Sequence, residues 1–273
     1  AIGYLASSAD VNTIAIGVGS GAAGTSASAF GANASALGDQ SFAAGYNSIA
    51  RGLNATAIGP EANAQGGNAT AIGLASKALG FNAQAFGRSA NALGNDSFAG
   101  GVNARAIGKN AFAFGRNAIA FGADSFAFGD QAYSSASGSN STSFGTKSQV
   151  NGLSSMAFGM GSYVAGGANS TALGTKAATN QNNAIAIGTS SYSNANNALA
   201  IGTGAISFGT NAFSIGSSAF SNGINATAIG SNANASHANS IALGADSLTS
   251  RDDQLMLGVA ATQVTIANLA NST

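Results

Sequence analysis

Small and variable residues alternate along this chain in a unit of seven that recurs over almost its whole length. The unit has a small residue, a variable one, a second small residue and a second variable one, then Gly and two residues that are usually polar. The clearest copies lie at 111–115, 118–122 and 125–129. A period of two predicts a short β-strand, and the Gly with its polar pair predicts a tight turn. A helix is excluded, because a Gly at every seventh residue would cost it about 1 kcal/mol each. So strict a repeat predicts a solenoid.

Asn is frequent at the last position of the unit. Gly and Asn tolerate a positive φ better than other residues, so we interpret these side chains as turn formers rather than as a ladder of ligand contacts. They are Asn47, Asn54, Asn68, Asn82, Asn103, Asn110, Asn117, Asn211, Asn225 and Asn232.

The first and third positions of the unit are small. From the unit that ends at Gly17 to the one that ends at Gly258, the first residue is Ala or Ser except at Thr13 and Gln254. These two positions share one face of the strand, so that face looks into a space too thin for large side chains. Two sheets packed back to back would leave such a space, and the second and fourth positions would then point outward.

The outward positions have a second period, of fourteen. Alternate units carry Ile, Leu or Phe at position four, with breaks at Ala44 and Gly100, and we name the outward side of these strands the apolar face. The other units are mostly polar there and form the polar face. Its large apolar exceptions are Leu37, Leu79, Leu93, Ile107, Phe121 and Phe208. One coil is therefore fourteen residues and two strands, and longer gaps at 136–145 and 166–174 add residues to a turn without exchanging the faces.

A continuous apolar face cannot stay in water. Burial of each large side chain contributes about 1.5–3 kcal/mol before the cost of ordering the chain, whereas the Ala and Ser interior offers little apolar area. We therefore predict an obligate oligomer whose main core lies between chains around a common axis. The residues expected in this interface are Ile14, Ile16, Phe30, Ile58, Ile72, Phe86, Phe112, Phe114, Phe126, Phe128, Phe144, Phe158, Leu173, Ile187, Ile201, Ile215, Ile229 and Leu243.

Repeats of the form Asn-Ala-Ile-Ala-Ile-Gly at 183–188, Asn-Ala-Leu-Ala-Ile-Gly at 197–202 and Asn-Ala-Thr-Ala-Ile-Gly at 54–59 resemble the head-domain repeats of trimeric autotransporter adhesins, the YadA-like family. The resemblance covers about residues 1–258. It implies a left-handed parallel β-roll, a homotrimer around the apolar axis, and adhesion at the surface of a Gram-negative bacterium. It also implies outer-membrane anchoring through parts absent from this chain.

Two segments follow from this pattern. Residues 1–258 are expected to form the β-roll head. Residues 259–273 drop the Gly repeat but keep a β-branched composition, and we expect a connector or neck-like segment there, leading toward a stalk outside this chain.

Composition offers little for chemistry. Lys plus Arg and Asp plus Glu both number nine, so no net charge steers the chain toward nucleic acid, and it has no cysteine. The only histidine, His237, stands at a Gly position of a turn. The best candidate for a cluster of metal-binding carboxylates is Asp246 with Asp252 and Asp253, and we interpret these residues as solvated turn residues. We predict a protein that is not an enzyme and uses no metal or cofactor.

The expected function is adhesion to host extracellular matrix, cell surfaces or other surfaces through the exposed faces of a rigid trimeric rod. Tyr133, Tyr163 and Tyr192 stand on the polar face and are candidate ligand anchors, although packing over a neighbouring chain or adjacent turn is the favoured explanation. The alternatives are a β-helical polysaccharide-binding or polysaccharide-active protein, or a purely structural spacer. A lattice-matching solenoid is disfavoured, because the recurring Thr residues lie on the apolar face.

Overall fold

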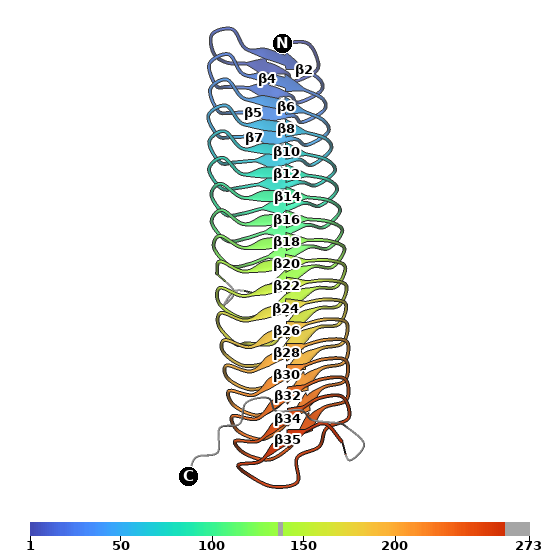
Figure 1. The fold of residues 1–273 in the computed structure, drawn as a ribbon. Helices are drawn as coiled ribbons and strands as arrows, with labels where there is room; N and C mark the ends of the chain where they lie inside the picture. Colours follow the sequence, from blue (N-terminus) through green and yellow to red (C-terminus); the bar gives the residue numbers. More distant parts are fainter. Residues whose placement is uncertain (136–138, 260–273) are drawn as a thin grey trace, which may run out of the picture. The chain divides into compact units, whose positions relative to one another are not determined.

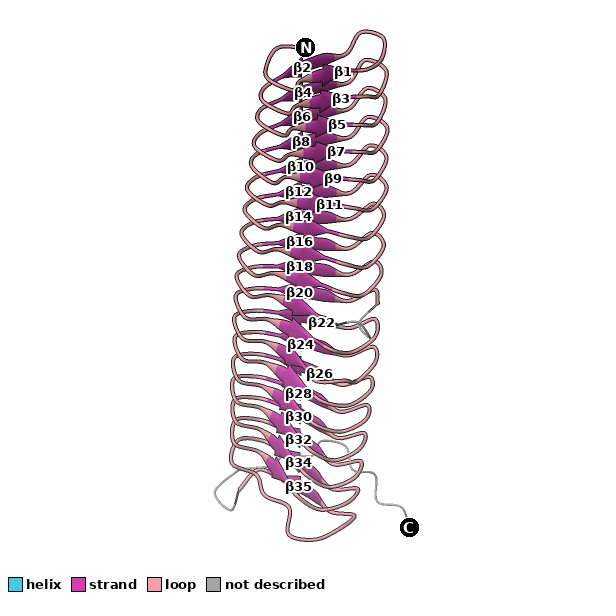
Figure 2. Cartoon of the chain, turned by 180° about the vertical axis from the view of Figure 1, so that it is seen from behind, coloured by secondary structure: helices cyan, strands magenta, loops and turns pink. Residues whose placement is uncertain are grey.

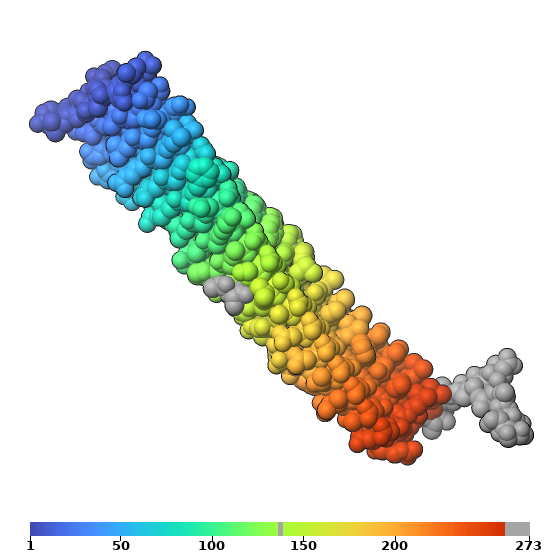
Figure 3. Space-filling model, turned by 90° about the vertical axis from the view of Figure 1, so that its left-hand side faces the viewer, coloured from blue at the N-terminus to red at the C-terminus, as the bar shows by residue number. Residues whose placement is uncertain are grey.

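The computed structural model describes residues 1–135 and 139–259, and these form two compact units, of which the second begins at Met156. Every regular element in the described ranges is a β-strand, and each unit is a stack of two-stranded coils (Figures 1 and 2). In the space-filling view the successive coils of each unit lie in contact (Figure 3). The predicted all-β parallel solenoid is confirmed.

The first unit, Ala1–Ser155, contains two parallel sheets. The strands of its apolar face are β2 (Ile14–Ile16), β4 (Ser28–Phe30), β6 (Phe42–Ala44), β8 (Thr56–Ile58), β10 (Thr70–Ile72), β12 (Gln84–Phe86), β14 (Phe98–Gly100), β16 (Phe112–Phe114), β18 (Phe126–Phe128) and β20 (Thr142–Phe144). Those of its polar face are β1 (Ser7–Ser8), β3 (Gly21–Ala22), β5 (Ser35–Ala36), β7 (Ile49–Ala50), β9 (Asn63–Ala64), β11 (Lys77–Ala78), β13 (Asn91–Ala92), β15 (Arg105–Ala106), β17 (Ile119–Ala120), β19 (Tyr133–Ser134) and β21 (Gln149–Val150).

The second unit repeats this plan. Its apolar face is formed by β22 (Met156–Phe158), β24 (Thr171–Leu173), β26 (Ile185–Ile187), β28 (Leu199–Ile201), β30 (Phe213–Ile215), β32 (Thr227–Ile229), β34 (Ile241–Leu243) and β35 (Leu255–Leu257). Its polar face is formed by β23 (Tyr163–Val164), β25 (Ala178–Thr179), β27 (Tyr192–Ser193), β29 (Ile206–Ser207), β31 (Phe220–Ser221) and β33 (Asn234–Ala235).

Strand pairing follows the fourteen-residue period. Ala71 pairs in parallel with Ala85, and the same step relates nearly all neighbours in each sheet. Where residues are inserted, the sequence separation between paired residues is larger: Phe126 pairs with Thr142, and Met156 pairs with Thr171. Each strand nevertheless stays on its own face. The strands on either side of each insertion therefore stay in phase, as the repeat predicts.

The interior of the coils is as thin as the small residues require. The buried side chains are overwhelmingly Ala and Ser, nearly all of them less than 2% exposed. The largest fully buried side chains are Val150, Val164 and Thr179. The variable residues therefore have no place inside and stand on the two outer faces.

The last turn position adopts a left-handed conformation in both turns of the coil. All ten Asn residues expected there have φ between 53° and 58°, which confirms their role as turn formers. Other residue types take the same φ, for example Ala75, Lys147 and Glu61. A left-handed φ costs a residue with a side chain of order 1 kcal/mol, and Asn reduces that cost.

The two turns of a coil differ at their Gly. After each described strand of the apolar face from β2 to β34, this residue is Gly with φ between 115° and 136°, a region that residues with a Cβ rarely adopt. The Gly after a polar-face strand, such as Gly209, has no positive φ. Asp10, Gln181, Ala195, His237 and Arg251 replace it in single coils. Backbone conformation thus explains why only one of the two turns admits other residues.

We expect Gly216→Ala to destabilise the protein more than Gly209→Ala. A Cβ on Gly216 would meet the Gly230 carbonyl oxygen at 2.4 Å and require alanine at φ 136°. A Cβ on Gly209 would meet the Gly223 oxygen at 1.9 Å without the φ penalty, and Ala195 already occupies the equivalent position one coil earlier. We expect an additional loss of about 1–3 kcal/mol for the first variant, measured by chemical denaturation. Equal losses would mean that close approach between coils, rather than φ, restricts this position.

Candidate binding surfaces

The apolar face lies open in the single chain. Every side chain expected in the oligomer interface lies on this face, in a strand from β2 to β34, and none is buried. Leu173, Phe114 and Leu243 are 45%, 44% and 42% exposed. The structure thus brings these residues together on one face, in each unit, as the sequence predicts. Their role in an interface stays a prediction.

Aromatic rings stack along part of this face. The rings of Phe98 and Phe112 have centroids 4.7 Å apart, those of Phe112 and Phe126 4.8 Å, and those of Phe128 and Phe144 4.9 Å, all nearly parallel. This spacing is the distance between strands, so parallel pairing itself places the rings in contact. The result is a continuous aromatic surface over β14–β20.

The break at Gly100 is filled by its neighbours. A Cβ built there would lie 2.7 Å from the Phe98 ring and 2.8 Å from the Phe114 ring. Gly100 is buried beneath these side chains, although its position faces outward. Sequence reasoning treated Gly100 as an interruption, whereas the large residue two positions earlier in the same strand supplies the missing apolar volume. Phe42 precedes the other break, Ala44, in the same way.

The polar face of the first unit carries a mixed apolar and basic strip. Leu79, Leu93, Ile107 and Phe121 follow β11, β13, β15 and β17 in successive coils. The guanidinium of Arg105 lies 5.7 Å from the centroid of the Phe121 ring. Tyr133 meets the same ring edge-on at 6.3 Å, so this candidate tyrosine packs over an adjacent coil.

The polar face of the second unit has a different character. Tyr192 lies edge-on to Phe208, with centroids 5.6 Å apart. Its hydroxyl accepts a hydrogen bond from Asn180 Nδ2 and donates one to Asn194 Oδ1 at 3.0 Å. Asn180 Nδ2 also donates to Asn194 Oδ1 at 2.7 Å. The Tyr192 side chain is therefore held in one orientation by residues of three successive coils, whereas Tyr163 lies half-buried two strands away in the same sheet.

Amide side chains form ladders along the turns that precede the apolar-face strands. Each Nδ2 donates to the Oδ1 of the equivalent residue one coil later, at 2.9–3.1 Å between Asn183, Asn197, Asn211, Asn225 and Asn239, and the last donates to Asp253. In the first unit, a shorter ladder from Asn54 ends at Asp96. A carboxylate accepts but cannot pass the ladder on, which explains its place at the end. The positions of the Asn residues were predicted, but their hydrogen bonds to one another were not.

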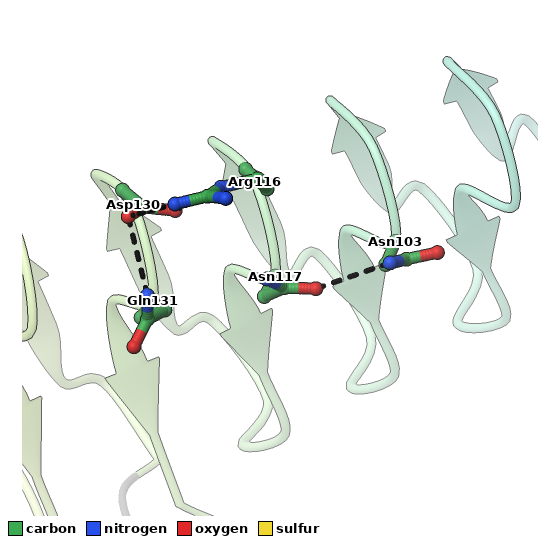
Figure 4. Close-up of polar contacts among 5 residues, drawn as sticks. All are labelled: Asn103, Arg116, Asn117, Asp130 and Gln131. Atoms are coloured by element: carbon green, nitrogen blue, oxygen red, sulfur yellow. Dashed lines mark hydrogen bonds and ion pairs between the residues drawn. The ribbon is translucent and has the colours of Figure 1, made fainter.

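The opposite turns hold a charged pair. Asn103 Nδ2 donates to Asn117 Oδ1 at 3.2 Å, and beside it Arg116 makes two hydrogen bonds of 2.9 Å to the Asp130 carboxylate (Figure 4). The hydrogen bond from Arg116 lowers the pKa of Asp130, and the same bond raises the pKa of Arg116. Arg116 is 63% exposed, so this pair contributes little to stability.

The described residues contain no detected pocket and no cluster of His, Cys, Asp and Glu that could hold a metal ion. Within the same ranges, no helix could cross a membrane. His237 lies half-buried with Nδ1 at 3.5 Å from Thr249 Oγ1. The candidate binding surfaces are therefore the two faces and the turns.

Comparison with known proteins gives one family. The family model described as YadA head domain repeat (2 copies) matches eight segments of the chain. They are residues 22–48, 50–76, 78–104, 106–132, 136–162, 165–191, 193–219 and 221–247. The crystal structure of the collagen-binding domain of Yersinia adhesin YadA is 22% identical to this chain. That match covers 81% of this chain and 89% of that one, with a TM-score of 0.28. No curated protein matches the chain.

We expect substitution of Asn211 to separate the two roles of the Asn ladder. Asn211→Gly keeps a residue that tolerates φ 55° but removes one hydrogen bond accepted from Asn197 and one donated to Asn225. Asn211→Ala removes the same bonds and adds the cost of a left-handed Ala. The Gly variant should lose about 1 kcal/mol, because the ladder is exposed, and the Ala variant about 1 kcal/mol more, by chemical denaturation. A Gly variant as stable as the parent would show that the ladder adds nothing.

Proposed function

This chain belongs to the YadA head-repeat family, and on that premise we propose that it is the ligand-binding head of a homotrimeric adhesin on a bacterial surface. Membership makes it an adhesin head and not an enzyme. The observation that carries the proposal is the segregation of outward side chains into an apolar face and a polar face. One face is suited to assembly, and the other stays available to a ligand.

We propose that the apolar face is buried between three chains. The number three and the left-handed roll are those implied by the family. The need for burial comes from the residues: the interior holds mainly Ala and Ser, whereas the apolar face exposes a row of Ile, Leu and Phe. At about 25 cal/mol per Å² of apolar area, burial of this face would add to the stabilisation that the thin interior supplies. The stacked rings over β14–β20 would then lie near the axis.

We propose that ligand contacts are made by the polar face. Tyr133, Tyr163 and Tyr192 remain candidate anchors for a host matrix protein or a cell-surface ligand. In the single chain, Tyr133 and Tyr192 pack against Phe121 and Phe208, which makes each tyrosine a preorganised contact rather than a mobile one. The proposed location is the outside of a Gram-negative cell, with anchoring in the outer membrane by other parts of the protein.

A charge on the apolar face should prevent assembly. We expect Ile201→Glu to abolish the trimer, because a carboxylate would be buried without a partner between chains. Asn222→Glu, on the polar face, is the matched control and should assemble as the parent does. Light scattering after size exclusion, at several concentrations, measures the mass, which we expect at three times the 26.1 kDa chain. A folded parent monomer would contradict the proposed interface.

Loss of the tyrosines should weaken adhesion. We expect the triple variant Tyr133→Ser, Tyr163→Ser and Tyr192→Ser to bind matrix-coated or cell-coated surfaces at least about tenfold more weakly than the parent, since aromatic anchors dominate many interfaces. The control is the same substitution at Tyr46, which lies on a turn and is 54% exposed. Unchanged binding by a trimeric, folded triple variant would remove these residues from the binding surface.

A further inference from the structure

The second unit carries a long uncharged stretch. From Ala177 to Ala245 the sequence contains no Asp, Glu, Lys or Arg. In the first unit, by contrast, Lys77 and Arg105 lie on the polar face. The strands β23–β31 therefore present no charged side chain to a ligand, and the nearest charge is Lys176 in the turn before β25.

The polar face of β23–β31 presents aromatic rings and amides instead. Its outward residues include Tyr163, Tyr192, Phe208 and Phe220, with Asn180 and Asn194 beside them. Phe208 contacts Tyr192 on one side and Phe220 on the other, with centroids 5.6 and 5.9 Å apart. The hydrogen bonds among Tyr192, Asn180 and Asn194 fix both the ring and the amides before a ligand arrives.

The two tyrosines are separated by a small residue. Tyr163 pairs with Ala178 and Ala178 pairs with Tyr192, so the Cα atoms of the two tyrosines lie two strands apart, about 9.6 Å along the stack. The Ala178 methyl fills little of the space between them. In an extended polysaccharide, equivalent faces of the sugar rings recur at every second sugar, a repeat of similar length.

We propose that the polar face of β23–β31 binds an extended, uncharged polysaccharide. Sugar rings offer apolar C–H faces to aromatic side chains and hydroxyl groups to amides, and the strip supplies both without charge. A linear chain fits the shape, because each strand contributes only two outward side chains and no pocket is detected in the described residues. This inference rests on the proposed function only in requiring the polar face to stay exposed in the assembly.

An extended peptide fits this strip less well. A peptide that adds to a sheet uses the free backbone groups of an edge strand. Here β25, β27 and β29 each pair with a strand on both sides, so their backbone groups are already engaged. Recognition must then come from side chains alone. The aromatic and amide side chains of the strip favour a neutral sugar ring over a charged ligand or a peptide that binds through its backbone.

The test uses the assembled protein and a panel of immobilised oligosaccharides. The neutral probes are hexamers of β-1,4-linked glucose and N-acetylglucosamine, a mannan and a galactan, and heparin is the anionic probe. We expect at least one neutral probe to bind with an affinity that is the same at low and high salt, because no ion pair contributes. Failure of every neutral probe, or salt-sensitive binding to heparin alone, would overturn the proposal.

Variants assign the binding to this strip. We expect Tyr192→Ser to weaken binding about tenfold and Tyr192→Phe to weaken it less, since the ring is kept while its hydroxyl bonds are lost. Ala178→Arg places a long side chain between the tyrosines and removes no contact, so we expect it to abolish binding. It therefore tests the strip independently of Tyr192→Ser, which could disturb the coil. Ser35→Arg, at the same strand position in the first unit, is the control and should bind as the parent does. Equal binding by Ala178→Arg and Ser35→Arg would place the glycan elsewhere and refute the assignment.

Adhesion of the same proteins to matrix-coated surfaces separates this proposal from the adhesive function. If matrix adhesion persists while no neutral probe binds, the glycan strip is wrong and the adhesin head stands. If neither is observed for a correctly assembled protein, both are wrong.

Discussion

The structure depends on the close parallel stacking of one coil on the next. Parallel backbone hydrogen bonds, with paired residues fourteen apart, hold the coils at strand spacing, and the two sheets leave room between them almost only for Ala and Ser. In the turns after the apolar-face strands this spacing brings backbone so near that a Cβ on Gly115 would lie 2.3 Å from the Gly129 oxygen. Variable residues are consequently excluded from the interior, and everything specific about the molecule stands on its outer faces.

That exclusion is why so much of the fold could be predicted from the sequence. Small residues at alternate positions, Gly in the turn and the fourteen-residue alternation predicted the coil, the two faces and the left-handed turn residues, and the described strands confirm them. The sequence did not predict the features that depend on contacts between neighbouring coils. The filling of the Gly100 position by Phe98 and Phe114, the hydrogen bonds of the Asn ladder and the different φ of the two turn glycines depend on neighbours in space that a linear pattern does not display.

The candidate binding residues show the same limit. Tyr133, Tyr163 and Tyr192 look alike in sequence, because each occupies the second position of a polar-face unit. In the structure their surroundings differ, since Tyr133 meets a ring beside Arg105, whereas Tyr192 is bonded to two amides in an uncharged region. The position in the repeat predicted that these side chains point outward, and the neighbouring coils decide which chemistry each can serve.

The fourteen-residue register also constrains how such a gene can change. Duplication or loss of 42 nucleotides, three for each of fourteen residues, would add or remove one whole coil and leave every later side chain on its own face. A change of 21 nucleotides would instead exchange the apolar and polar faces of all that follows, and selection would remove it. The chain can thus be lengthened or shortened by recombination in steps of about 4.8 Å while its apolar face is preserved.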